Sequence, residues 1–542
     1  MNNYSTPGVY TEEIPVLPPS VAASSTAIPA FIGCTEKTSK DGSSLEFSAI
    51  KVSTLLEYQE LFGGPKTASF NVTMNAQNTI EEVTVTAPEH KLYHSVDHYF
   101  KNGGGECYIV SLGNYSTITD ENTFLKGLGA LSVEDEPTLI VLGEATSLKN
   151  SLYYEVCKQA LAQCGELKDR FCILDVQNGA EIEDFRTGVG TEYLKYGAAY
   201  TPYLQTTINY AYNDEDIVIS GSSSIEIVEA VVGDAIKVTR RKDDSVAKLK
   251  ITKGSAGDSL SFSVSGSVLT IAAVGDEGIS AADLKTAWDS FSGDKGGFSI
   301  TVLDASAVVE FSTTQIELVS SADNTFTLAD IRGTQLYARI ANEVAKKRVV
   351  LPPSAAIAGV YSKTDRERGV WKAPANVSLN SVLGPVTRIS DKGQESLNID
   401  NDFGGKSINA IRSFVGKGTL VWGARTLDGN SNEWRYINVR RLFNMIEESV
   451  KKSTQFAVFE ANDAVTWLKV KAMIQSFLYG IWQQGGLAGS TEDQAYFVNV
   501  GLGKTMTQQD ILEGKMIFEI GLAASRPAEF IILKFSHKLQ ES

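Results

Sequence analysis

The sequence predicts a mixed α/β protein of several domains. Three observations indicate this class. Apolar runs of strand length alternate with helix-period segments over residues 27–204, the composition shifts to short alternating runs near residue 205, and helices alternate with strands again from residue 330. A chain of 542 residues exceeds one ordinary hydrophobic core, which favours two or three domains.

The elements of the first part follow from local signals. Thr54 precedes Glu57 in a capping-box pattern that predicts a short helix, and Pro88 is placed to begin another helix that the glycines at 103–105 end. Residues 66–87 are polar and rich in threonine and asparagine, so we expect a hairpin inserted at the surface. Buried strands are predicted at residues 30–32, 107–110, 139–142 and 171–174.

Residues 205–329 differ from their flanks. They are rich in serine, glycine, aspartate and valine, and their apolar residues alternate with polar ones in short runs. This pattern is typical of half-buried strands. We therefore predict an inserted β-rich domain.

The C-terminal part is predicted to centre on a helix after residue 436, in which apolar residues recur at three- and four-residue spacing. This spacing leaves Arg440 and Arg441 on the faces that are exposed to solvent. Residues 419–422 and 456–459 are apolar runs that we interpret as buried. Asp463 is expected to cap a second long helix with Val465 and Leu468 on its inner side. Strands are predicted at residues 496–500, 515–521 and 530–538.

Charge and cysteine usage exclude several classes of protein. The net charge of −16 argues against a nucleic-acid coat or a binder of anionic membranes, because both need concentrated positive charge. The five cysteines form no CxxC pair and are odd in number, so they indicate reduced thiols rather than a zinc ribbon or a disulfide framework. No run of 18 apolar residues and no signal-like start is present, so we expect neither membrane insertion nor export by the usual signal.

No motif for catalysis is complete. The run at 501–505 ends in Gly-Lys-Thr, but a phosphate-binding loop needs glycine where Val498 stands. His90, His94 and His98 recur every four residues and could in principle bind a metal, yet nothing marks a third ligand, so a packed helix face is the simpler interpretation. We expect no enzyme activity, no catalytic residues, no cofactor and no metal.

Eight segments resemble, in order, those of contractile tail sheath proteins, the outer-tube subunits of contractile phage tails, bacteriocins and related injection systems. They are residues 6–13, 27–33, 351–361, 365–376, 407–412, 418–460, 519–521 and 526–530.

The resemblance implies a structural subunit that surrounds an inner tube, polymerises as a helical array and contracts to drive the tube through a target envelope. The implied domains are an N-terminal extended arm at 1–20, the sheath core at 21–204 and 330–529, an inserted outer domain at 205–329, and a C-terminal arm at 530–542. Arms from neighbouring subunits would complete a C-terminal β-sheet, with the proline-rich segment before Val21 as the hinge.

The resemblance also implies residues for two contacts. Strand exchange between subunits would use Pro7, Gly8, Val9, Tyr10, Ile531, Leu533 and Phe535. The inner tube would meet a helix of the C-terminal domain, and the candidate residues are Lys469, Lys471, Lys451 and Lys452.

The implied partners are further copies of the chain in stacked hexameric rings, an inner tube protein, and baseplate and tail terminator or cap proteins. Nucleic acid and direct membrane insertion are not expected. Assembly would take place in the bacterial cytoplasm, in a phage tail or a tail-like particle that is released or anchored at a membrane. A surface-layer or baseplate structural protein is the alternative, and an enzyme is less well supported.

Overall fold

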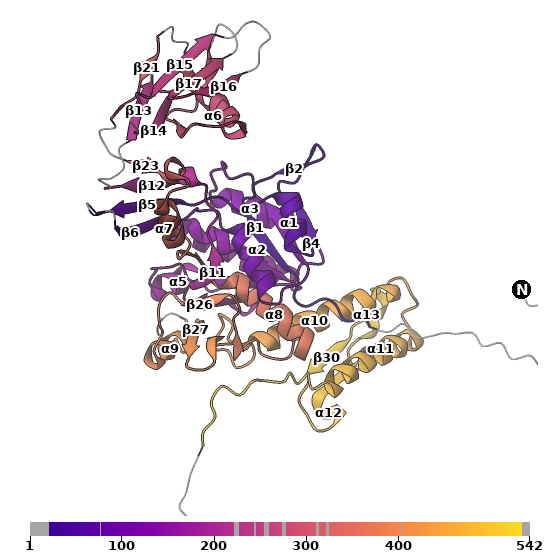
Figure 1. The fold of residues 1–542 in the computed structure, drawn as a ribbon. Helices are drawn as coiled ribbons and strands as arrows, with labels where there is room; N and C mark the ends of the chain where they lie inside the picture. Colours follow the sequence, from indigo (N-terminus) through magenta and orange to yellow (C-terminus); the bar gives the residue numbers. More distant parts are fainter. Residues whose placement is uncertain are drawn as a thin grey trace, which may run out of the picture. The chain divides into compact units, whose positions relative to one another are not determined.

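The computed structural model describes residues 21–75, 77, 79–221, 227–242, 245–253, 260–273, 278–310, 314–320, 325–400, 402 and 404–533. The chain forms two compact units (Figure 1). Unit 1 comprises residues 1–64, 90–206 and 350–542, and unit 2 comprises residues 65–89 and 207–349. Among the described residues, no helix is both long and apolar enough to cross a membrane.

A nine-stranded sheet forms the centre of unit 1, in the order β25-β28-β27-β10-β9-β8-β1-β7-β4. The six strands from β27 to β7 run parallel, and the outer strands are antiparallel to their neighbours. The strands are β1 (Pro29–Gly33), β4 (Ala49–Val52), β7 (Cys107–Ser111), β8 (Leu139–Val141), β9 (Phe171–Asp175), β10 (Gly197–Thr201), β25 (Val377–Ser378), β27 (Ile408–Phe414) and β28 (Gly418–Val421).

Helices cover both faces of this sheet, which explains its continuous apolar runs. One face packs against α3 (Glu121–Leu131), α4 (Asn150–Leu167) and α5 (Ile182–Gly188). The other packs against α1 (Leu55–Phe62), α2 (Leu92–Lys101) and α8 (Ser354–Arg368). The strands predicted at 30–32, 107–110, 139–142 and 171–174 are present.

Two predicted helix starts in this region have different outcomes. Thr54 caps α1 as expected, because its side chain accepts a hydrogen bond from the Glu57 N–H. The helix predicted to begin at Pro88 begins instead at Leu92, and the Lys91 cap makes no side-chain hydrogen bond. The first N–H groups of α2 are satisfied by a residue distant in sequence, Glu144, which local reading could not identify.

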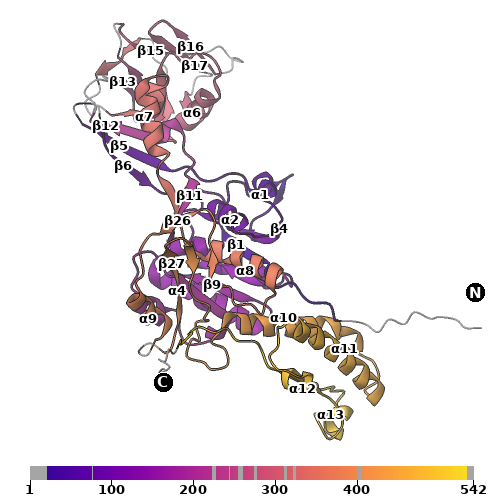
Figure 2. The same ribbon diagram turned by 60° about the horizontal axis from the view of Figure 1, so that its bottom comes forward.

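The C-terminal layer of unit 1 is a pair of helices with a small ribbon, α10 and α11 lying side by side (Figures 1 and 2). Its elements are α10 (Ile437–Ser453), η5 (Gln455–Ala457), α11 (Ala464–Gln483), α12 (Glu492–Ala495), β29 (Tyr496–Asn499), α13 (Gln508–Leu512) and β30 (Glu519–Leu522). Leu442, Ile446, Ile474, Leu478 and Val498 are among the buried residues that join the helices to the ribbon.

Unit 1 contains several shorter elements. These are β2 (Ser39–Lys40), β3 (Ser43–Ser44), η1 (Gly143–Ser147), η2 (Leu194–Tyr196), β26 (Val382–Pro385) and α9 (Asp391–Asn398). The strands β11 (Leu204–Asn209) and β24 (Arg348–Leu351) contain the points at which the chain passes from one unit to the other.

Unit 2 is β-rich, as predicted, and packs a core around the buried Trp288. Its strands are β5 (Ser69–Met74), β6 (Ile80–Thr86), β12 (Ile217–Ser220), β13 (Ile227–Val232), β14 (Ile236–Arg241), β15 (Lys248–Lys253), β16 (Ser261–Ser265), β17 (Val268–Ala273), β18 (Ile279–Ser280), β19 (Phe298–Val302), β20 (Val308–Val309), β21 (Ile316–Glu317), β22 (Val319–Ser320) and β23 (Phe326–Thr327). Its helices are η3 (Asp214–Asp216), α6 (Ala281–Ser290), η4 (Leu328–Ile331) and α7 (Gln335–Val344).

The hairpin predicted at 66–87 is present as β5 and β6, and β5 pairs in parallel with β12. Unit 2 therefore draws on two separate stretches of chain and is larger than the predicted insertion at 205–329.

Three predictions in the C-terminal layer are wrong. The run at 456–459 begins in the 3-10 helix η5, which ends at Ala457, and continues into an exposed Val458 and a fully exposed Phe459. Val465 and Leu468 point outward from α11, whose inner face is Val470, Ile474 and Leu478 instead. Residues 530–533 form no strand, and the remainder of the strand predicted at 530–538 lies outside the described residues. In each case the apolar residues were identified correctly, but the sequence did not show whether other parts of the same chain pack over them.

Candidate functional site: the arm roots and the open ribbon

Helix α10 carries a buried polar face that the sequence did not reveal. Arg440 and Arg441 were predicted on wet faces, but they are 2% and 3% exposed. Asn438, Asn444 and Ser449 are buried on the same helix. Burying two guanidinium groups costs free energy unless they are paired, so their partners show which segments of the chain α10 holds in place.

Arg441 holds the N-terminal segment at residues 21–28, here called the N-terminal root. Its guanidinium donates a hydrogen bond to the carbonyl of Thr26 at 2.7 Å. It also forms a bidentate salt bridge with Asp365 of α8, with hydrogen bonds of 3.0 and 2.5 Å. It also lies over the Tyr361 ring, 4.6 Å from the ring centre. About two turns further along α10, Ser449 makes a second contact with this segment, because its Oγ accepts a hydrogen bond from the Ser24 N–H at 2.9 Å.

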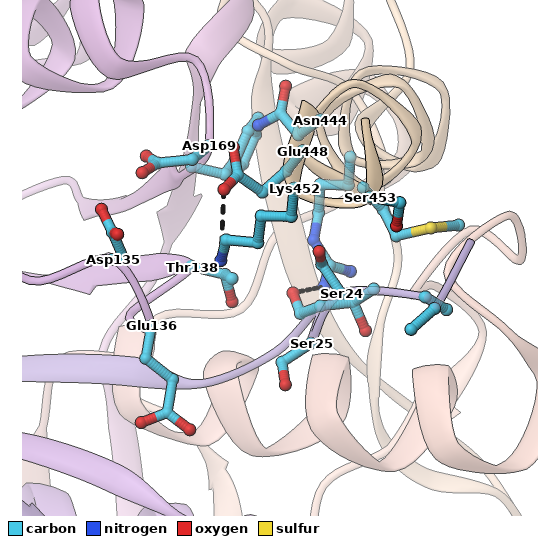
Figure 3. A pocket seen from close by; sticks show the side chains of 16 residues that line it. Ser24, Ser25, Asp135, Glu136, Thr138, Asp169, Asn444, Glu448, Lys452 and Ser453 are labelled. Carbon is cyan, nitrogen blue, oxygen red and sulfur yellow. Dashed lines mark hydrogen bonds and ion pairs between the residues drawn. The ribbon is translucent and has the colours of Figure 1, made fainter. Parts of the chain in front are cut away.

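A cavity of about 510 Å³ lies beside the N-terminal root (Figure 3). Asp135, Glu136, Asp169 and Glu448 supply carboxylates to its lining, and Lys452 supplies an ammonium group. Figure 3 shows Lys452 turned toward Glu448, to which it is paired at 3.1 Å. These side chains form a mostly acidic wall with no arrangement for catalysis.

The C-terminal segment at residues 523–529, here called the C-terminal root, is held in the same way. Asn438 donates to the carbonyl of Ser525 at 3.0 Å. Arg425 donates to both oxygens of Glu529 at 2.9 and 2.6 Å, and Tyr436 donates to Glu529 at 3.2 Å. Both roots are thus held by side chains of α10, and the C-terminal root is held also by Tyr436, which precedes this helix, and by Arg425.

The chain beyond the C-terminal root is apolar and exposed. Phe530, Ile531, Ile532 and Leu533 are 69–80% exposed. Four consecutive large apolar residues in water are unfavourable for a chain on its own, and such a patch usually marks a contact. The strand-exchange residues Ile531 and Leu533 belong to it, whereas Pro7, Gly8, Val9, Tyr10 and Phe535 lie outside the described residues.

The ribbon of β29 and β30 has two open edges. Four residue pairs join the strands, from Tyr496–Leu522 to Asn499–Glu519, and in the described structure neither strand has a second neighbour. Tyr496 and Val498 face the α10–α11 core, while Phe497 is 47% exposed. A two-stranded ribbon is marginally stable alone, and its unpaired N–H and C=O groups are a template for further strands.

The four lysines proposed for tube contact do not form one group. Lys451 and Lys452 both pair with Glu448, which neutralises part of their charge. Lys469 and Lys471 lie on α11, whose sequence contains no acidic residue. Because Val465, Leu468 and Lys469 share its outer face, that face is apolar and basic in an otherwise acidic protein.

Within the part of the chain that the structure describes, one cluster has metal-ligand composition, namely Cys34, His90 and Glu144. Both oxygens of Glu144 are already engaged. Oε1 accepts from the Cys34 N–H at 2.7 Å and lies 3.3 Å from His90 Nδ1, and Oε2 accepts from the Lys91 and Leu92 N–H groups at 2.9 and 2.8 Å. The carboxylate acts as a hydrogen-bond hub, so the cluster does not favour a metal.

The other two histidines are packed, as the simpler interpretation held. His94 and His98 are buried in α2, and burial lowers the pKa of each to about 4. Both are therefore neutral at pH 7, without a carboxylate that would assign them to acid–base chemistry.

Comparisons with known proteins agree with this description. Residues 430–538 match the family model described as the phage tail sheath C-terminal domain. The tail sheath protein of Vibrio phage KVP40 is 28% identical over 137 residues, which is 25% of this chain and 20% of that protein. The aligned part thus spans about a fifth of the length of the curated relative.

Solved structures match over a longer range. A chain of the anti-feeding prophage helical sheath in the contracted state is 28% identical, with a TM-score of 0.56, over 99% of this chain and 100% of that one. A sheath chain of the PVC extracellular contractile injection system, also contracted, is 27% identical with a TM-score of 0.56 over 99% of both chains. The resemblance to contractile tail sheath proteins is confirmed, as is the mixed α/β fold.

Proposed function

We propose that this chain, a relative of contractile tail sheath proteins, is the repeating structural subunit of a sheath that surrounds an inner tube and shortens to drive it forward. The observation that supports this most directly is the juxtaposition on one helix layer of two pinned roots and an open ribbon. Nothing in the described residues assembles a catalytic site, and a structural role needs none.

Strand exchange is the step that the open ribbon suits. Arms from two neighbours would pair with the free edges of β29 and β30, so that main-chain hydrogen bonds cross the subunits. Each such bond contributes roughly 1 kcal/mol net, and a dozen per lattice point would hold neighbours together while the lattice changes. Head-to-tail contacts that do not close a ring generate the helical array.

The roots limit where the arms can bend. Arg441 and Ser449 fix the chain as far as Ser24, and Arg425 fixes it as far as Glu529. The N-terminal hinge therefore belongs before Ser24, in accordance with the hinge proposed before Val21. The C-terminal hinge belongs just after Glu529.

The inner tube would meet the outer face of α11. Lys469 and Lys471 are the better candidates, because Lys451 and Lys452 are paired with Glu448. Exposed ion pairs contribute about 0 to 1 kcal/mol each, which is weak enough for the tube to slide. Val465 and Leu468 would add apolar contact that the sequence prediction did not include.

Unit 2 would lie on the outer surface of the sheath. Further partners would be baseplate and terminator or cap proteins, and assembly would take place in the bacterial cytoplasm. The energy of contraction would come from greater burial and better pairing in the shortened lattice, so this chain would need no nucleotide.

Electron microscopy of the overexpressed chain tests the proposal. Hollow, helically striated cylinders are expected. A surface-layer protein would give flat sheets instead, and a baseplate protein would give closed rings or monomers.

A truncation tests strand exchange separately. Removing residues 1–15 should leave a folded, soluble subunit, because the N-terminal root and the sheet remain intact, but cylinders should be lost. Normal cylinders from the truncated chain would refute strand exchange while leaving the sheath proposal in place.

A further inference from the structure

The sheet of unit 1 has the strand order of doubly wound proteins that bind ligands. When the antiparallel edge strand β4 is left out, the parallel strands β7, β1, β8, β9 and β10, numbered along the chain, stand in the order 2-1-3-4-5. In such sheets the strand order reverses at the first strand, because one connection leads from it to its neighbour on one side and the next connection crosses to its neighbour on the other side. Ligands bind in the crevice beyond the carboxyl ends of the two strands at that point. Here these are β1 and β8.

Glu144 lies at that point. The chain leaves β1 at Gly33 and β8 at Val141, and Glu144 follows in η1. Its carboxylate accepts hydrogen bonds from Cys34, the first residue after β1, and from Lys91 and Leu92 at the start of the ten-residue helix α2. Main-chain N–H groups at a helix start form an anion site, because they carry partial positive charge and lack helical partners.

The niche is closed and shaped for a flat anion. Glu144 is 3% exposed, and His90, whose ring stacks on Tyr115, completes its wall. A Cβ atom added at Gly33 would lie 2.8–2.9 Å from the Glu144 carboxyl atoms, so glycine is needed there for the close approach. Little room is left around the planar group.

We propose that Glu144 is a built-in anionic ligand, which fills the switch-point site of this sheet, and that the empty niche of a Glu144→Ala chain binds a small carboxylate such as formate or acetate. The side chain stands at the point where sheets of this strand order bind ligands. Sulfate is tetrahedral and larger than a planar carboxylate, so we expect it to fit the same space less well.

The test compares thermal unfolding of full-length Glu144→Ala in sodium formate, sodium sulfate and sodium chloride at equal ionic strength and pH 7.5. Formate well above its dissociation constant is expected to raise the Tm of the variant, relative to chloride, by about 2 to 4 °C more than it raises the Tm of the wild type. Sulfate stabilises folded proteins in general because it is excluded from their surface, so it should shift the Tm of both chains equally. The wild-type chain should show no such gain, since its niche is filled. Equal effects of formate on both chains, or none on the variant, would overturn the proposal.

Glu144→Gln is the matched variant. Its amide keeps the size of the side chain but turns one acceptor into a donor that faces main-chain N–H groups. It should therefore lose stability without any gain from formate. If Glu144→Gln is as stable as the wild type, the charge of Glu144 is irrelevant and the proposal fails. Should Glu144→Ala not fold in chloride, its soluble refolding yield in formate against chloride gives the same comparison.

Discussion

The nine-stranded sheet and the β29–β30 ribbon belong to the same unit but solve the problem of unpaired edges differently. In the sheet, helices bury both faces, and short antiparallel strands end it on each side. The ribbon buries one face only, and both of its edges are open. The sheet is complete within one chain, whereas the ribbon has the form of a structure that other chains complete.

Exposed apolar side chains show the same contrast. The sheet strands contain almost none, but Phe497 of the ribbon and the four residues after Glu529 are exposed. Substitutions in the sheet should consequently affect the unfolding of the subunit, whereas substitutions in the ribbon should affect its assembly.

The largest effect on the free energy of unfolding is expected at Arg441 of α10, the helix that packs against the ribbon and is paired with α8 of the sheet layer. Arg441→Met removes the partner of the buried Asp365 and the donor to Thr26, and should lower the free energy of unfolding by about 3 to 5 kcal/mol, because an unpaired buried charge is costly. Denaturant unfolding measures it. Adding Asp365→Leu should restore much of the loss, and a double variant as unstable as the single one would contradict this explanation.

A core truncation in the sheet should cost somewhat less. Ile173 of β9 is fully buried, so Ile173→Ala should lower the free energy of unfolding by about 2 to 5 kcal/mol through lost burial and a cavity. The midpoint of urea unfolding reports the change. A loss below about 1 kcal/mol would mean that the sheet core repacks freely and is less complete than described.

Acid should weaken the sheet region through α2. His94 has its pKa lowered to about 4 by burial, against about 6.5 when unfolded, so the unfolded state binds the extra proton. Its contribution is full above pH 6.5 and is lost as the pH falls toward 4, by about 2 kcal/mol at pH 5. His94→Leu should flatten this part of the pH–stability curve, and an unchanged curve would rule His94 out as the cause.

The smallest effect on the monomer is expected in the ribbon. Phe497→Ala should change the free energy of unfolding by less than about 1 kcal/mol, since half of the ring is already in water, yet it should impair cylinder formation. Leu56→Ala on α1, which removes a still more exposed side chain, is the matched control and should assemble normally. Equal assembly of both variants would show that the ribbon is not an assembly surface.

Some features of the site could be predicted from sequence, and others could not. The caps of α1 and α11 were predictable because Thr54 and Asp463 act on N–H groups two or three residues away. Arg441 was assigned to water because its partners Thr26 and Asp365 are 415 and 76 residues distant. No local pattern distinguishes a charged residue facing solvent from one that is buried against a distant partner.

The sequence by itself determined the α/β class, the strands of the central sheet, the short strands that follow residue 205 and the resemblance to sheath proteins, since periodicity and short motifs are local properties. Only the tertiary structure decided that Val465 and Leu468 face outward, that Glu144 caps a helix whose first residue is 52 positions earlier, and that both roots meet on α10. The physical reason is that apolar periodicity defines a stripe on a helix, whereas packing between distant segments determines whether that stripe is covered.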